Sequence, residues 1–169
     1  MTHSHDHSDV ESLDPHVFGT QQDCFGCSPR HPIGFRLRFE KHGDEVVARF
    51  VPGAQYEGPP GIMHGGLQAT LVDEVAAWTI VGLRKKMGFT ATMQVKLIKP
   101  IRTGREVTAR GRIVKDSPRL VTIVVVLEQD GSPAVNGELV FAIPDERGAE
   151  RILERELPDE WKRLCRGAT

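Results

Sequence analysis

The order of the hydrophobic patterns predicts an α+β domain in which an antiparallel sheet surrounds one long helix. Residues 65–87 are apolar on nearly all sides, which is typical of a buried helix. Apolar residues recur in strand-like patterns in six other segments: 33–40, 45–51, 89–98, 106–115, 119–129 and 134–143. Two of these precede the helix and four follow it. Because helix and strands are not interleaved, the sheet is expected to be antiparallel.

Turn-forming residues separate these elements. The first two strands form a hairpin around residues 42–44, and the Gly/Pro-rich loop 52–63 leads into the helix, which Gly88 is expected to end. Polar residues 1–23 are expected to be disordered or poorly ordered, since they offer little apolar area. Residues 24–144 form the domain, and residues 145–169 form a charged tail with a short amphipathic helix at about 158–166.

Composition excludes several classes of protein. The chain has 22 Lys and Arg and 23 Asp and Glu, a net charge of −1, so it lacks the basic excess of a nucleic-acid-binding protein. No stretch approaches the roughly 18–20 apolar residues of a membrane span, and the polar N-terminus is unlike a signal peptide. Three cysteines, an odd number, favour a reducing compartment, and we expect the cytoplasm.

Six strands and one helix cannot cover both faces and both edges of the sheet. We therefore expect an oligomer that extends the sheet or covers its exposed face.

The start of the helix suggests an anion-stabilising site. Gly65 and Gly66 follow His64 where the loop becomes a helix, and the first N–H groups of a helix have no internal partner. Without Cβ atoms, these glycines allow a ligand to approach the backbone. They could donate to a carbonyl oxygen under attack, or they could simply be a glycine-containing helix entry.

Asp73 lies in the middle of this apolar helix, where a carboxylate is costly without a partner or a task. At about 1.5 Å per residue it is about 13 Å from His64, so the two cannot meet within one chain. Two antiparallel helices of a dimer would bring Gly65 of one chain to Asp73 of the other. Glu74 is the rival carboxylate and points about 100° away around the helix.

The segments His64–Asp73 (HGGLQATLVD) and Thr90–Pro100 (TATMQVKLIKP) resemble the hotdog-fold acyl-CoA thioesterase superfamily, in particular its phenylacetate-pathway-like members. The resemblance covers about residues 24–143. It implies that an antiparallel sheet wraps around a central helix, and that dimers, commonly paired into tetramers, hold the active site between subunits.

The resemblance also implies roles for single residues. Gly65 would donate its N–H to the thioester oxygen, Asp73 would act as general base or nucleophile, and Thr90 would position water. His64 would orient the loop or have a purely structural role. Gly66 and Glu74 are further candidates for substrate contact.

Basic residues near strand ends could hold the phosphates of CoA, or could simply be solvated surface charges. We expect Arg119 and Lys99 to be the residues that hold them. The resemblance implies acyl-CoA as the substrate and requires no cofactor.

One departure concerns the loop before the helix. Several relatives carry Asn or Gln where this chain has Gly58, so a polar contact is absent or is supplied elsewhere, by Gln55 or Glu57. A non-catalytic acyl-CoA-binding protein is therefore an alternative. A hotdog enoyl-CoA hydratase is less favoured, because it needs an Asp and a His close together on one chain.

Two groups of residues contain metal-ligating side chains, and we expect a metal at neither. Cys24 and Cys27 form a Cys-x-x-Cys pair, but a structural zinc usually needs four ligands, which only His31 and His42 could complete. A packed structural turn is the expected role. The alternating His3, His5 and His7 are interpreted as part of a flexible tail.

Overall fold

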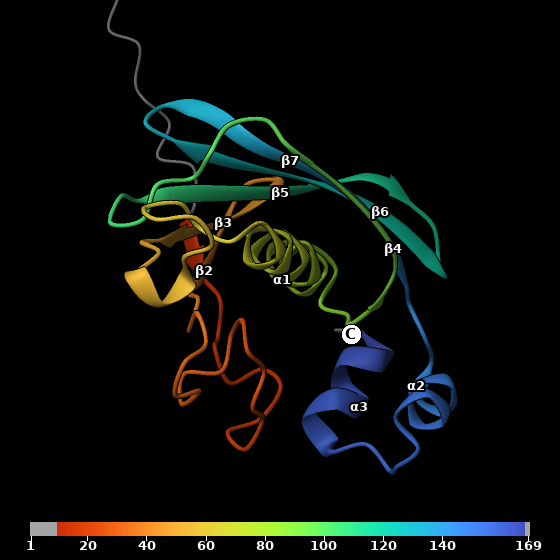
Figure 1. The fold of residues 1–169 in the computed structure, drawn as a ribbon. Helices are drawn as coiled ribbons and strands as arrows, with labels where there is room; N and C mark the ends of the chain where they lie inside the picture. The colour runs from red at the N-terminus through yellow and green to blue at the C-terminus, as the bar shows by residue number, and fades with distance from the viewer. Residues whose placement is uncertain (1–9, 168–169) are drawn as a thin grey trace, which may run out of the picture.

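The computed structural model describes residues 10–167. Seven antiparallel strands curve over the long helix α1 (Gly65–Arg84), as Figure 1 shows. The strands are β1 (Val10–Ser12), β2 (Phe39–His42), β3 (Glu45–Phe50), β4 (Phe89–Leu97), β5 (Val107–Asp116), β6 (Leu120–Gln129) and β7 (Ser132–Ala142). Their order across the sheet is β1-β2-β3-β5-β6-β7-β4. The predicted fold class, α+β with an antiparallel sheet around one central helix, is confirmed.

Helix α1 sits directly on the backbone of the sheet. A Cβ added to Gly111 of β5 would lie 2.2 Å from Thr79 Oγ1, and one added to Gly137 of β7 would lie 2.4 Å from Val72 Cγ1. Real Cβ atoms do not approach other atoms so closely. The two glycines therefore let the helix settle into the concave face of the sheet.

Replacing Gly137 with alanine is expected to destabilise the protein by about 1–3 kcal/mol, because the new methyl group would overpack a dense core. The neighbouring Asn136 is exposed, so Asn136→Ala is the matched control and should change the free energy of unfolding by less than about 0.5 kcal/mol. Urea denaturation followed by circular dichroism measures both values. Equal stability of the two variants would contradict this description of the core.

The element boundaries agree with the sequence prediction to within a few residues, with two exceptions. The helix ends at Arg84 instead of Met87, because Lys85 adopts a left-handed conformation (φ 54°) and its N–H bonds to the carbonyl of Val81. The first strand of the predicted hairpin, 33–40, is mostly irregular. The N–H groups of Phe35 and Leu37 bond instead to carbonyls of the Phe25–Gly26 turn.

The expectation of disorder does not hold for residues 10–23. Strand β1 pairs with β2 through main-chain hydrogen bonds, which need no apolar side chains, and Leu13 is buried. Residues 1–9, including the three alternating histidines, lie outside the described part of the chain.

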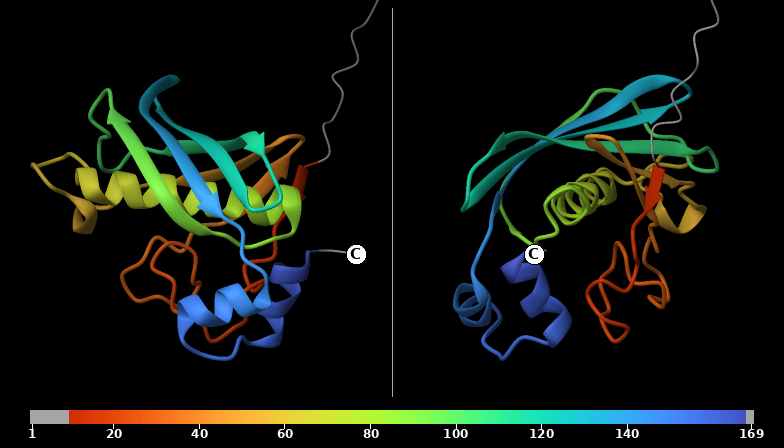
Figure 2. Two further views of the ribbon diagram at one scale, coloured as in Figure 1. Left: turned by 90° about the vertical axis from the view of Figure 1, so that its right-hand side faces the viewer. Right: turned by 180° about the vertical axis from the view of Figure 1, so that it is seen from behind.

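The C-terminal segment forms two helices, α2 (Glu146–Leu153) and α3 (Asp159–Arg166). The second was predicted; the first was missed, although Asp145 caps its N-terminus. Figure 2 shows that both helices and the N-terminal loops lie on the side of α1 that faces away from the sheet. Among the helices described, none is both long and apolar enough to cross a membrane.

Candidate active site

The entry of α1 is fixed by hydrogen bonds from the preceding loop. His64 caps the helix, its Nδ1 accepting from the N–H of Gly66 at 3.0 Å, and its own N–H bonds to the carbonyl of Tyr56 at 2.8 Å. The N–H of Gly66 is thereby engaged. Gly65, the first residue of the helix, has an N–H that no intrahelical carbonyl can accept. Of the two predicted donors, Gly65 is therefore the better placed to bind an oxygen.

Asp73 and Thr90 are brought together. Thr90, at the start of β4, donates its hydroxyl to Asp73 Oδ1 at 2.6 Å. Asp73 is only half-buried in the single chain, whereas the sequence suggested a fully buried carboxylate. It lies on a partly open face of α1, so one carboxylate oxygen is fixed while the group remains accessible.

That open face of α1 is lined by short side chains. Ala69, Thr70, Asp73 and Ala77 are all partly exposed. Beside it runs β4, which has a strand partner on one side only within residues 10–167.

Gly65 and Asp73 are eight helical residues apart, about 12 Å, so one chain does not bring them together. The sequence-based conclusion that a complete site needs two chains stays a prediction.

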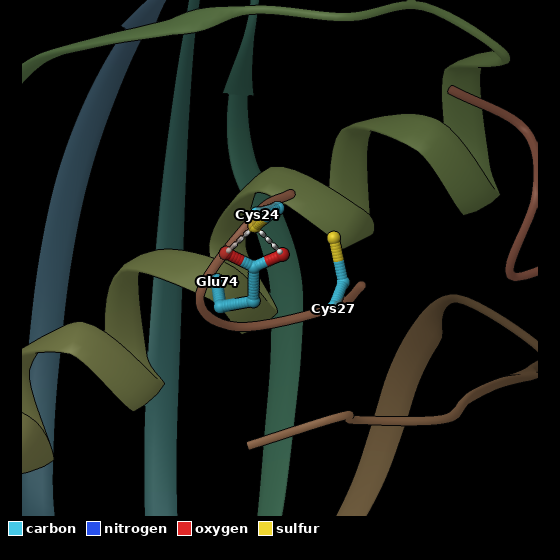
Figure 3. A group of neighbouring side chains, drawn as sticks. All are labelled: Cys24, Cys27 and Glu74. Atoms are coloured by element: carbon cyan, nitrogen blue, oxygen red, sulfur yellow. Dashed lines mark hydrogen bonds between the residues drawn. The ribbon is translucent and has the colours of Figure 1, made fainter. Parts of the chain in front are cut away.

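Glu74 points toward Cys24 and Cys27 of the N-terminal turn (Figure 3). Cys24 Sγ lies 3.4 Å from both oxygens of its carboxyl group, and the indole N–H of Trp78 donates to Glu74 Oε1 at 3.2 Å. Cys27 completes the group: one ligand atom from each of Cys24, Cys27 and Glu74 lies within 4.8 Å of the others. His31 and His42 do not join it, since His31 packs on Phe25 and His42 bonds to Glu40.

The protonation of this group is unusual. Burial, together with the charge of Cys24, raises the pKa of Glu74 to about 8. A hydrogen bond from Cys27 and the N–H groups of Cys27 and Gly26 lower the pKa of Cys24 to about 5. The same hydrogen bond, followed by burial, raises the pKa of Cys27. Near neutral pH the cluster thus carries its negative charge on Cys24, with Glu74 protonated.

Cys24 should accordingly react with iodoacetamide at a rate that barely changes between about pH 6 and pH 8, because the reactive thiolate is already formed above a pKa of about 5. Cys165 is the internal control. Burial raises its pKa, so its rate should climb about tenfold per pH unit over the same interval. Brief alkylation followed by peptide mass spectrometry measures both rates. A Cys24 rate that rises as steeply as that of Cys165 would contradict the assignment.

A small apolar pocket of about 170 Å³ adjoins the cluster. Ala77, one turn beyond Asp73, and Phe89, next to Thr90, are among its lining residues. The N-terminal loop and α3 contribute Phe18 and Trp161. Sequence reasoning missed these two because they lie outside the expected domain, and the amphipathic pattern of 158–166 was the only signal.

The two predicted phosphate-binding residues lie far apart. Lys99 follows β4 and its Nζ bonds to Ser132 Oγ at 3.1 Å, at the start of β7. Arg119 precedes β6, and its carbonyl accepts from Ile143, just beyond the end of β7. They are separated by about the length of β7, roughly 30 Å, so within one chain they do not form a single site.

Gly58 packs against His64. A Cβ at position 58 would lie only 3.3 Å from His64 Cα. The backbone of Gly58 therefore lies close to the residue that caps the helix, and there is little room for a larger side chain. The carboxylate of Glu57, one of the two predicted substitutes, accepts a hydrogen bond from Thr103 Oγ1 at 3.0 Å.

Residues 60–135 match the family model described as the thioesterase superfamily. The chain is also 33% identical over 91 residues to an acyl-coenzyme A thioesterase, THEM4, of Xenopus laevis; this covers 53% of the chain and 40% of that protein. The match thus spans less than half of that relative.

Solved structures share the fold. A thioesterase superfamily protein, RHA08564, superposes with a TM-score of 0.68 at 24% identity, covering 78% of this chain and 66% of the other. A hypothetical thioesterase from Streptococcus pneumoniae, crystallised with coenzyme A, gives a TM-score of 0.58 at 18% identity, covering 63% and 86%. The match over residues 60–135 and the shared fold make this domain similar to the thioesterase superfamily.

Proposed function

We propose that the protein is an acyl-CoA thioesterase whose active site is formed by two chains of a homodimer. The observation that carries the proposal is the Thr90–Asp73 hydrogen bond of 2.6 Å on the open face of α1. A carboxylate held in this way by a hydroxyl is suited to orient a water molecule or an acyl carbon. The relatives named for acyl-CoA hydrolysis and for bound coenzyme A support acyl-CoA as the substrate.

Exposed apolar residues support the dimer. Strand β4 is an edge strand, and its Met93 and Leu97 are 46% and 54% exposed. An open edge with apolar side chains is poorly suited to contact with water and is well suited to pairing with another strand. Antiparallel packing of two α1 helices along their short side chains would bring Gly65 of one chain near Asp73 of the other.

In the proposed reaction, the substrate carbonyl accepts a hydrogen bond from the N–H of Gly65. In one route, Asp73 removes a proton from water as the water oxygen attacks the acyl carbon, and the C–S bond of the tetrahedral intermediate then breaks. In the other, the Asp73 carboxylate attacks the acyl carbon, the C–S bond breaks to leave a mixed anhydride, and water hydrolyses that anhydride. In both routes the CoA sulfur leaves as a thiolate that takes up a proton. The N–H of Gly65 stabilises the negative charge that develops on the carbonyl oxygen.

Thr90→Val removes the hydroxyl that fixes Asp73 and is expected to lower kcat about tenfold or more, with little change in stability because Thr90 is exposed. Thr90→Ser keeps the hydroxyl and should retain most of the activity. Steady-state hydrolysis of one acyl-CoA by both variants makes the comparison. If the valine and serine variants are equally active, Thr90 has no positioning role.

Arg119 is the stronger candidate for the CoA phosphates. It lines an open hollow of about 530 Å³ together with Lys86 and Arg151, with Asp145 as the acidic residue in the lining. Several cations around one hollow favour a phosphate more than a single surface charge does. Lys99 lies at the other end of β7. It would have to contact a different part of the substrate, or the substrate bound in the site of the partner chain.

An assay against a panel of acyl-CoAs tests the function. Acetyl-, hexanoyl-, phenylacetyl- and palmitoyl-CoA are followed by the loss of thioester absorbance, which protein thiols do not disturb. Hydrolysis of any of these acyl-CoAs supports the proposed thioesterase function. Tight binding without loss of the thioester would instead support the acyl-CoA-binding alternative, which the glycine at position 58 keeps open.

We further propose that the dimers pair into tetramers and that the protein resides in the cytoplasm, where its three free thiols would remain reduced. Light scattering coupled to gel filtration tests the assembly. A monomer at micromolar concentration would contradict the proposed site, because a monomer has no complete one.

A further inference from the structure

The group formed by Cys24, Cys27 and Glu74 takes no part in the proposed hydrolysis. It joins an N-terminal turn to the helix that carries Asp73 (Figure 3). Placing two thiols and a carboxyl group together in a partly buried position is unfavourable, because desolvation destabilises their charged forms. A cation bound between them would offset that penalty.

We infer that Cys24, Cys27 and Glu74 bind a zinc ion. Cysteine thiolates and carboxylates are ordinary zinc ligands, and two cysteines separated by two residues are the usual chelating spacing. With Zn–S of about 2.3 Å and Zn–O of about 2.0–2.2 Å, tetrahedral coordination requires a sulfur–oxygen separation of about 3.5 Å. The separation from Cys24 Sγ to either Glu74 oxygen is 3.4 Å. Cys24 and Glu74 are therefore already spaced as the ion requires, and the ligand atom of Cys27 lies within 4.8 Å of theirs.

The turn itself is built for this arrangement. A Cβ on Gly26 would lie 2.4 Å from Glu74 Cδ, so the glycine between the cysteines is what admits the carboxyl group. The indole of Trp78 holds Glu74 Oε1 from the other side.

Three protein ligands leave one position of a tetrahedral ion to water or another small ligand. The three residues also line the apolar pocket of about 170 Å³, which provides that space. Because Glu74 adjoins Asp73 on α1, the ion would fasten the N-terminal turn to the helix one residue from the proposed catalytic carboxylate.

Cobalt titration of the 169-residue chain tests the site, with His3, His5 and His7 changed to alanine so that they cannot compete. Cobalt bound by thiolates gives a charge-transfer absorption, and this band should saturate at about one equivalent and be displaced by zinc. Zinc retained after gel filtration in metal-free buffer should also approach about one ion per chain. Zinc should protect Cys24 from iodoacetamide.

Variants assign the ligands. Cys24→Ser and Cys27→Ser should each weaken binding more than about tenfold and reduce the thiolate band, whereas Glu74→Gln should weaken binding while keeping the band. Cys165→Ser is the matched control, because Cys165 is another buried free cysteine outside the cluster, and it should bind as the parent does.

The inference would be overturned if the chain with all three cysteines gave no cobalt–thiolate absorption band. It would also be overturned if the band remained in Cys24→Ser. An intact mass two hydrogens lower would also overturn it, since the cysteines would then form a disulfide. None of these measurements needs an acyl-CoA, so failure here is distinct from failure of the proposed hydrolysis.

Discussion

Asp73→Asn is expected to lower kcat by about 10²–10⁴-fold, the usual contribution of a general base, while KM changes little. Asparagine has nearly the same shape, and its carbonyl oxygen can still accept the hydroxyl of Thr90, a bond of 2.6 Å in the parent protein. The variant should therefore fold and dimerise normally. The measurement is steady-state loss of thioester absorbance, with the melting temperature as a check on folding.

The neighbouring carboxylate provides the matched comparison. Glu74→Gln should lower kcat by less than about tenfold, because Glu74 faces Cys24 and Trp78 and not the open face of α1. Wild-type turnover by Asp73→Asn would remove Asp73 from the mechanism. Loss of turnover in Glu74→Gln alone, in a chain that still folds, would transfer the role to Glu74.

Patterns along the sequence predicted the central helix and five of the strands, because each depends on local periodicity. Leu71, Val75 and Trp78 recur on one side of the helix and are buried. The segment of β6 is almost continuously apolar in sequence, and its Val121, Ile123 and Val125 are buried. The helix entry also follows from local rules, since His64 and the two glycines are consecutive.

Features that depend on pairing between distant segments could not be predicted in this way. Strand β1 is ordered by main-chain bonds to β2, which leave no hydrophobic pattern. Residues 33–38 have a strand-like pattern, but the Cys24–Cys27 turn takes their backbone hydrogen bonds.

The environment of Glu74 could not be predicted for the same reason. The sequence pattern predicted that Asp73 is the buried carboxylate of the helix. In the structure, burial raises the pKa of Glu74, whose partner Cys24 lies 50 residues away in the chain. Only the folded chain shows that contact.

Gly65→Pro is expected to lower kcat about 10²–10³-fold, equivalent to about 2.7–4 kcal/mol of transition-state stabilisation, because it removes the N–H proposed to bind the oxyanion. Proline is favoured at the first position of a helix. His64 has φ −56° and ψ 132°, a conformation that suits the residue before a proline. The substitution therefore removes the donor without removing the helix.

Gly65→Ala is the matched control for this variant. It adds a Cβ that would lie 3.1 Å from Leu97 Cδ1, the end of a flexible side chain, and it keeps the N–H. It should retain most of the parent turnover. Equal activity of the proline and alanine variants would show that the N–H of Gly65 is not needed.

Combining the two inactive variants tests whether the site lies between chains. A dimer of one Asp73→Asn chain and one Gly65→Pro chain, isolated with two different tags, contains one site that draws Gly65 from the first chain and Asp73 from the second. The other site lacks both groups. The mixed dimer should therefore recover about half of the parent activity, although each variant alone is nearly inactive. If both groups acted within one chain, every site of the mixed dimer would be defective and activity would stay at the level of the single variants.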